Sequence, residues 1–125
     1  LITSNLKDVD IAIICFAVDN RVSFYNVKAY WMQKVTQIPI ILLGLKIDLR
    51  YNQDKDSPVK MISYQEGKEL AETLSMKYME FCVTKDEKQQ LENIEEIFKL
   101  AMEFSQEKQN SKNENLKGNK KCLIL

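Results

Sequence analysis

The sequence predicts an α/β fold with a mostly parallel sheet and helices on both faces. Two runs, residues 11–18 and 38–44, are continuously apolar and rich in β-branched side chains. Strands that are buried on both faces of a parallel sheet have this composition. Amphipathic segments with helical spacing alternate with these runs. Such alternation is typical of βαβ units with right-handed crossovers.

The first strand is expected over residues 11–18, and the following Asp19-Asn20 supplies a turn. Ser23 is expected to cap a helix that continues to about residue 35. Its apolar side chains recur at helical spacing, at Phe24, Val27 and Trp31. Residues 38–44 are expected to form the second strand, with Pro39 near its start, where a missing N–H is tolerated.

Residues 50–60 are polar and are expected to form a loop. The sequence from Ser63 to Glu66 matches a capping box, which predicts a helix to about residue 74. Residues 78–83 are expected to form a third strand. A final helix is predicted from an apolar stripe, which consists of Leu91, Ile94, Phe98, Ala101 and Phe104.

The domain is expected to span residues 1–104, followed by a flexible tail over residues 105–125. This tail lacks apolar periodicity and is dominated by Asn, Gln, Lys and Ser up to residue 121, as disordered segments are. The chain opens without an initiator Met or a signal peptide, so we expect a fragment.

Composition narrows the possible functions. The chain has 18 basic residues (Lys and Arg) and 18 acidic residues (Asp and Glu), so its net charge is zero. The overall charge therefore does not indicate nucleic-acid binding. The 125 residues contain no His, the most common general base and metal ligand, and the three Cys are too far apart for a zinc site. No metal site is therefore predicted in this chain.

The last four residues, from Cys122 to Leu125, match the C-a-a-X prenylation signal, and a terminal leucine favours geranylgeranyl. We therefore expect Cys122 to be lipidated. Basic side chains in the tail are expected to assist membrane binding: Lys112, Lys117, Lys120 and Lys121. One lipid with a modest basic cluster predicts reversible attachment, with cycling between membrane and cytosol.

The second strand is followed by Gly44-Leu-Lys-Ile-Asp-Leu-Arg50, which resembles the base-recognition motif of small GTPases of the Ras superfamily, Asn/Thr-Lys-x-Asp. The Leu-Arg ending resembles the Rho branch. Other segments resemble that branch in the same order, such as Ser23-Phe-Tyr-Asn-Val27 and Ser63-Tyr-Gln-Glu-Gly67. The resemblance covers nearly the whole chain.

This resemblance assigns guanine recognition to Asp48, whose carboxylate can accept two parallel hydrogen bonds from the base. Lys46 corresponds to the lysine whose stem lies along the base. Thr84 and Lys85 correspond to the family's second base loop, although Thr84 is equally well interpreted as an ordinary strand-end residue. Leu45 replaces the family's Asn or Thr, and losing that polar contact costs about 1–3 kcal/mol.

The resemblance implies a partial P-loop GTPase-type fold that binds GTP or GDP with Mg²⁺. No Gly-x-x-x-x-Gly-Lys-Ser/Thr segment occurs, so neither the phosphate-binding loop nor any catalytic residue is identified in this chain. We expect these parts and the Mg²⁺ ligands to precede residue 1. The chain would then be the C-terminal portion of the domain, inactive alone, while the full-length parent hydrolyses GTP.

The family resemblance implies a signalling switch at the cytoplasmic face of membranes, most simply the plasma membrane, acting on the actin cytoskeleton, morphology or polarity. Its partners would be exchange factors, GTPase-activating proteins, dissociation inhibitors and effectors. A catalytically inactive, prenylated pseudo-GTPase that serves as a binding module is the alternative, motivated by Leu45. A flavodoxin-like or response-regulator-like domain shares the alternating pattern but explains neither Asp48 nor the C-terminal signal.

Overall fold

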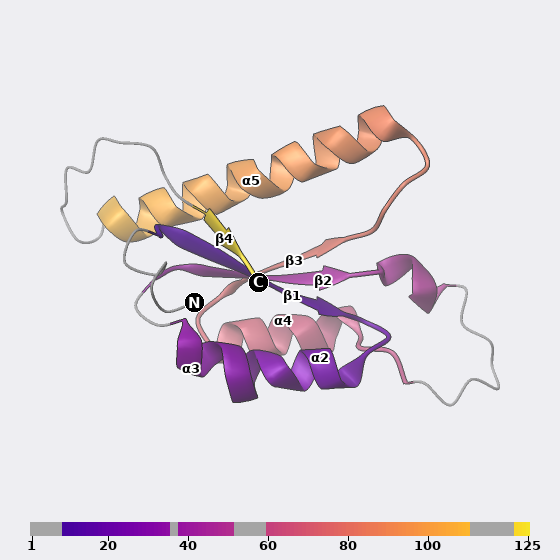
Figure 1. Ribbon diagram of the computed structural model, residues 1–125, viewed down its shortest axis with the longest axis horizontal. Helices are drawn as coiled ribbons and strands as arrows, with labels where there is room; N and C mark the ends of the chain where they lie inside the picture. The colour runs from indigo at the N-terminus through magenta and orange to yellow at the C-terminus, as the bar shows by residue number, and fades with distance from the viewer. Residues whose placement is uncertain (1–8, 36–37, 52–59, 111–121) are drawn as a thin grey trace.

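The computed structural model describes residues 9–35, 38–51, 60–110 and 122–125. Its centre is a parallel four-stranded sheet in the order β3-β2-β1-β4 (Figure 1). The strands are β1 (Ile11–Ala17), β2 (Ile40–Leu45), β3 (Lys77–Phe81) and β4 (Cys122–Ile124). The first three confirm the predicted strands with small shifts at their ends.

Helices cover both faces of this sheet (Figure 1). One face carries α2 (Arg21–Asn26), which continues through a π-helical turn (Val27–Trp31) into α3 (Met32–Lys34), together with α4 (Tyr64–Thr73). The other face carries α5 (Glu87–Asn110), and a short 3₁₀ helix, η3 (Ile47–Arg50), follows β2. The predicted α/β class, with helices on both faces, is confirmed.

The alternating side chains of the strands form two separate cores. On the α2–α4 face, the fully buried side chains of Ile14, Phe16 and Leu42 pack with those of the helices. On the α5 face, Ile13 and Ile41 pack against α5. Because β1 and β2 are buried on both sides, their residues are apolar at every position rather than at alternate ones.

The first helix is capped differently from the prediction. Asn20, not Ser23, is the N-cap, and its Oδ1 accepts a hydrogen bond of 3.1 Å from the Ser23 backbone N–H. The Ser23 hydroxyl accepts a 3.0 Å hydrogen bond from the Ala17 N–H and donates to the Asn20 carbonyl at 2.7 Å. Ser23 therefore joins the end of β1 to the helix, a role that needs the folded turn.

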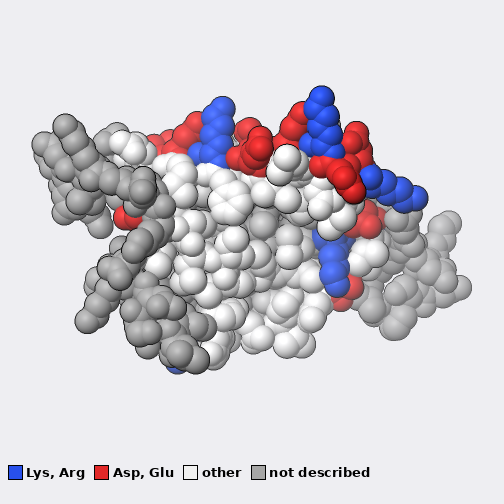
Figure 2. Space-filling view, turned by 45° about the horizontal axis from the view of Figure 1, so that its top comes forward, with Lys and Arg blue, Asp and Glu red and all other residues white. Residues whose placement is uncertain are grey.

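The buried stripe of α5 also differs from the prediction. Ile97, Ala101 and Phe104 are buried, whereas Leu91 is 58% exposed and Phe98 is 37% exposed. The helix continues through Asn110, beyond the expected end at residue 104, and Ser105 is fully buried. The surface of α5 carries many charged side chains, which gather above a broad uncharged face in Figure 2.

The chain end is part of the sheet. Cys122 and Ile124 pair with Ile11 and Ile13 of β1 in parallel register, and the Leu125 N–H donates to the Ile13 carbonyl at 2.8 Å. The predicted flexible tail is therefore wrong for residues 122–124. Residues 111–121, which include the four tail lysines, lie outside the described residues. None of the described helices is long and apolar enough to cross a bilayer.

Candidate functional site

A cavity of about 550 Å³ lies at the carboxyl ends of β2 and β3. Ligands of open parallel sheets bind at this edge of the sheet. The β2 side contributes Leu45, Lys46, Asp48 and Leu49, and the β3 side contributes Phe81, Cys82 and Val83. Three residues selected from the sequence, Leu45, Lys46 and Asp48, thus surround one cavity.

A left-handed turn at Lys46 directs the chain from β2 into η3. Lys46 has φ 63° and ψ 34°, a conformation that costs a non-glycine residue about 1–2 kcal/mol. Its carbonyl accepts a hydrogen bond of 3.0 Å from the Leu49 N–H, which closes the turn. Strained residues of this kind concentrate at ligand sites. The turn brings Lys46 and Asp48 to the same cavity.

The chemistry of the cavity is that of an apolar slot with one acid. Leucine, phenylalanine and valine side chains supply most of its wall, and Asp48 supplies an exposed carboxylate. Apolar walls can contact both faces of a flat ring, while a carboxylate can accept hydrogen bonds at the edge of that ring. The arrangement suits a planar heterocycle with adjacent N–H donors.

Arg50, which was expected to begin the polar loop over residues 50–60, lies in η3 and anchors it. Its Nη1 and Nη2 donate to the two Glu80 carboxylate oxygens at 2.9 Å and 2.6 Å. Its Nε donates to the Ile62 carbonyl at 2.8 Å. The Arg50 and Glu80 side chains are only 17% and 13% exposed. The segment that carries Asp48 is thereby tied to β3 and to the entry of α4.

Tyr78 completes this network from β3. Its hydroxyl donates to Glu80 at 2.6 Å, and its ring lies against Gly44 and Gly67, where a Cβ atom would collide with it. Burial, and then the hydrogen bond to Glu80, raise the pKa of Tyr78 well above its usual range. The hydrogen bonds to Glu80 raise the pKa of Arg50, so both groups keep their protons at neutral pH. The spacing of residues in the sequence did not predict this network of Arg50, Tyr78 and Glu80.

Thr84 and Lys85 are not among the described residues that line the cavity. The Thr84 hydroxyl donates to the Asp86 carbonyl at 3.0 Å, within the loop that leads into α5. Asp86 caps α5, since its Oδ1 accepts from the Lys88 N–H at 3.0 Å. Cys82 and Val83, the neighbours on the β3 side, line the cavity instead. Base contact by Thr84 or Lys85 stays a prediction.

A family model described as the Ras family matches residues 1–110. The chain belongs to the Ras family. Rho-related relatives place this Ras-family protein in the Rho branch. It is 32% identical over 102 residues to "Rho-related protein racM" of Dictyostelium discoideum, a match that covers 78% of this chain and 52% of that protein.

A second match, to "GTP-binding RHO-like protein" of Candida albicans, is 47% identical over 58 residues and covers 43% of this chain and 17% of the relative. A third, to "Rho-related protein racL" of Dictyostelium discoideum, is 27% identical over 129 residues and covers 95% of this chain and 63% of the relative. The Rho-type chain thus spans less than two thirds of the length of these relatives.

Ras-family proteins use a guanine nucleotide with Mg²⁺. The side chains that line the cavity fit the base of such a nucleotide, because apolar walls are combined with the Asp48 carboxylate, which accepts hydrogen bonds. Within the described ranges, no group of three His, Cys, Asp or Glu side chains is placed to hold a metal ion.

Proposed function

We propose that the cavity at the ends of β2 and β3 binds the guanine base of GTP or GDP. The observation that carries this proposal is the position of Asp48 in an apolar cavity next to Lys46. Guanine presents N1–H and an exocyclic amine side by side, and a carboxylate accepts both in a charge-assisted pair. Adenine presents an acceptor at the N1 position, which would leave the carboxylate unpaired.

The remaining walls would position the base. Leu45 and Leu49 approach from the β2 side, and Phe81 and Val83 approach from the β3 side. The methylene stem of Lys46 can cover the ring while its ammonium group stays in water. The left-handed turn at Lys46 would orient this stem, so the backbone conformation serves ligand binding.

The full-length protein, on this proposal, is a Rho-type switch. GTP would hold its switch loops ordered, hydrolysis to GDP would release them, and effectors would bind one of the two states. Exchange factors, GTPase-activating proteins and dissociation inhibitors would set the balance, with output to the actin cytoskeleton, cell morphology or polarity. The 125-residue chain alone would be inactive as a GTPase.

Membrane attachment is proposed to depend on geranylgeranylation of Cys122, which would place the protein at the cytoplasmic face of the plasma membrane, in exchange with the cytosol. Cys122 is half-buried in β4, and burial raises the pKa of its thiol. Modification would therefore require β4 to leave the edge of β1. Replacing Cys122 by Ser should shift the protein to the cytosolic fraction of cells.

Base recognition is tested by titrating fluorescent GDP into the full-length gene product. Asp48→Asn should lower GDP affinity at least about 100-fold, because two hydrogen bonds to a charged group are lost. Asp48→Asn should also shift the relative affinity from guanine toward xanthine nucleotides, since the new amide can donate a hydrogen bond to the carbonyl that xanthine has in place of the exocyclic amine of guanine. Asp86→Asn is the matched control, because asparagine caps helices as well as aspartate does. Unchanged GDP affinity in Asp48→Asn would refute the proposal.

A pseudo-GTPase that acts as a membrane-bound binding module is the second candidate. Leu45 favours it, because an apolar side chain lines the cavity where the family has Asn or Thr. Failure of the full-length product to bind GDP or GTP, with Cys122-dependent membrane attachment retained, would support this candidate. Leu45→Asn should then restore some nucleotide binding. Tight GDP binding by the unaltered full-length product would exclude the pseudo-GTPase candidate.

A further inference from the structure

The outer edge of β3 is open in the part of the chain that the structure describes. The strand order β3-β2-β1-β4 places β3 at the end of the sheet, and no described segment pairs with its outer side. An edge strand presents a row of backbone N–H and C=O groups that can pair with another chain. The edge of β3 is therefore a potential acceptor for an added strand.

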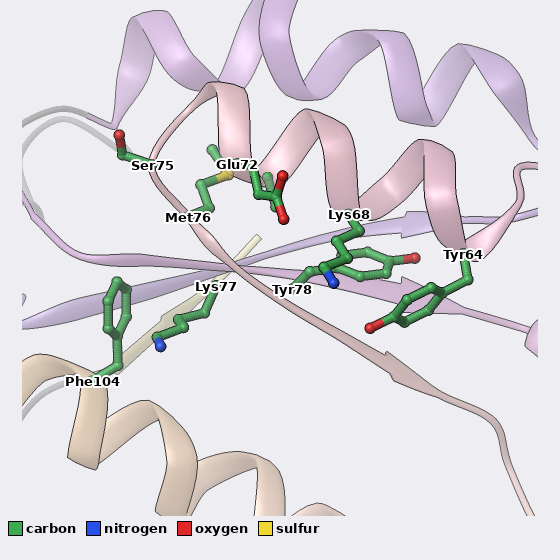
Figure 3. Close-up of a pocket in the computed structure, with 9 residues that line it drawn as sticks. Tyr64, Lys68, Glu72, Ser75, Met76, Lys77, Tyr78 and Phe104 are labelled. Carbon is green, nitrogen blue, oxygen red and sulfur yellow. The ribbon is translucent and has the colours of Figure 1, made fainter.

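Two adjoining cavities flank this edge, one mainly toward α4 and the other mainly toward α5. The cavity on the α4 side has a volume of about 420 Å³ and is lined by Tyr64, Lys68 and Glu72 of α4 together with Tyr78 of β3. Figure 3 shows these side chains reaching from α4 and β3 into the same space. Lys77, Tyr78 and Phe104 contribute to both cavities. Space for side chains thus exists on both sides of the edge.

The second cavity, on the α5 side, has a volume of about 210 Å³. Its apolar part includes Met79 of β3 and Leu100 and Phe104 of α5, and Glu103 and Glu107 of α5 give it an acidic border. Side chains of an extended strand alternate between the two faces of a sheet. A strand added to β3 would therefore direct alternate side chains into the two cavities.

Aromatic contacts shape the α4-side cavity and its rim. The rings of Tyr64 and Tyr78 meet edge to face, with centroids 5.4 Å apart. The Lys77 Nζ lies 5.6 Å from the centroid of the Phe104 ring, and Figure 3 shows this pair on the opposite side of the cavity from Tyr64. These contacts hold the lysine near the strand edge.

The charges differ between the two faces. On the α4 side, Lys68 supplies an ammonium group next to the carboxylate of Glu72. On the α5 side, where the Lys77 ammonium lies over the Phe104 ring, Glu103 and Glu107 outnumber Lys77, so that cavity favours a cationic group. The Lys68 ammonium on one face and the acidic border on the other match a strand that carries an acidic side chain next to a basic one.

We propose that the β3 edge binds an extended peptide segment of a protein partner, which adds a strand to the sheet. Its acidic side chain lies in the α4-side cavity near Lys68, and the adjacent basic side chain lies near Glu103. Main-chain hydrogen bonds supply the affinity, and the two cavities supply the specificity, as in other strand-addition complexes. This site shares no lining residue with the proposed base site.

The test measures fluorescence anisotropy of a labelled pentapeptide with the 125-residue chain. The peptide has acetyl and amide ends, glutamate at its second position, lysine at its third and valine elsewhere. We expect saturable binding that weakens roughly fivefold in Lys68→Glu and in Glu103→Lys, the size of an exposed ion pair. The control Lys28→Glu, at an exposed position that lines neither cavity, should bind as the unaltered chain does.

Three further measurements separate strand addition from other binding. Two further peptides are N-methylated at alternate residues, one at the odd and one at the even positions. The peptide whose methyl groups replace the N–H groups that face β3 should not bind, and binding of both peptides equal to that of the unmethylated peptide would overturn the proposal. A peptide with glutamate and lysine exchanged should bind more weakly. Absence of saturable binding to the unaltered chain would overturn the proposal, as would a dimer in sedimentation that Lys68→Glu dissociates, since a second copy would then occupy the edge.

Discussion

Replacing Gly67 by alanine should destabilise the protein, the opposite of what helix propensity predicts. Gly67 lies within α4, where alanine is normally favoured over glycine by about 1 kcal/mol. A Cβ at this position, however, would overlap Cζ and the hydroxyl oxygen of Tyr78 and would lie 2.6 Å from Cε1. The ring of Tyr78 fills the space that the alanine methyl group needs.

Two contacts oppose a movement of the Tyr78 ring away from Gly67. Its ring stacks on Phe16, with centroids 6.3 Å apart, and its hydroxyl donates to Glu80 at 2.6 Å. Overpacking costs about 1–3 kcal/mol, and losing the hydrogen bond to a charged group adds about 1.5–3 kcal/mol. After subtraction of the gain in helix propensity of about 1 kcal/mol, we expect Gly67→Ala to lower the free energy of unfolding by about 1.5–5 kcal/mol.

Urea unfolding followed by circular dichroism measures this change, with the double-mutant cycle through Tyr78→Leu as the control. In the Tyr78→Leu background the collision is absent, so Gly67→Ala should be neutral or stabilising by up to about 1 kcal/mol. A rise in the unfolding midpoint of Gly67→Ala alone would refute the reasoning. An equal cost in both backgrounds would also refute it.

Three other substitutions test the anchor, the strained turn and an ion pair. Arg50→Met should lower the free energy of unfolding by about 2 kcal/mol, because it leaves the Glu80 carboxylate poorly solvated; an unchanged urea midpoint would contradict this. Lys46→Gly should raise the free energy of unfolding by about 1 kcal/mol by relieving the left-handed strain, yet weaken GDP binding by the full-length product. A decrease in the free energy of unfolding would show that the turn is not strained. The hydrogen bond from Arg21 lowers the pKa of Glu66 in the folded state, so the pair stabilises above about pH 4.5 and this contribution is lost as the pH falls through the lowered pKa. Glu66→Gln should therefore be less stable than the unaltered chain at pH 7 but not at pH 2.5, and a constant difference would exclude this linkage.

Local sequence patterns determined the elements and the location of the proposed base site. The apolar runs at residues 11–18 and 38–44 predicted β1 and β2 because strands buried on both faces need apolar side chains at successive positions. The capping box at Ser63 predicted the start of α4, and the structure confirms that the Ser63 hydroxyl accepts from the Glu66 N–H at 3.1 Å. Residues 45–48 follow β2 directly, so their position at its carboxyl end required only the strand itself.

Tertiary structure alone decided which distant residues meet. The cap at Asn20 displaced the predicted Ser23 because the Ser23 hydroxyl contacts the end of β1 once the turn is formed. Several other features depend on strand register and on how the layers pack: the Arg50–Glu80 pair, the contact of Tyr78 with Gly67, the pairing of β4 with β1, and the choice of Ile97 over Leu91 as a buried residue of α5. A sequence pattern records only the spacing of neighbours along one element. These contacts join segments that lie far apart in the chain, so their partners are fixed only when the sheet and its helices are assembled.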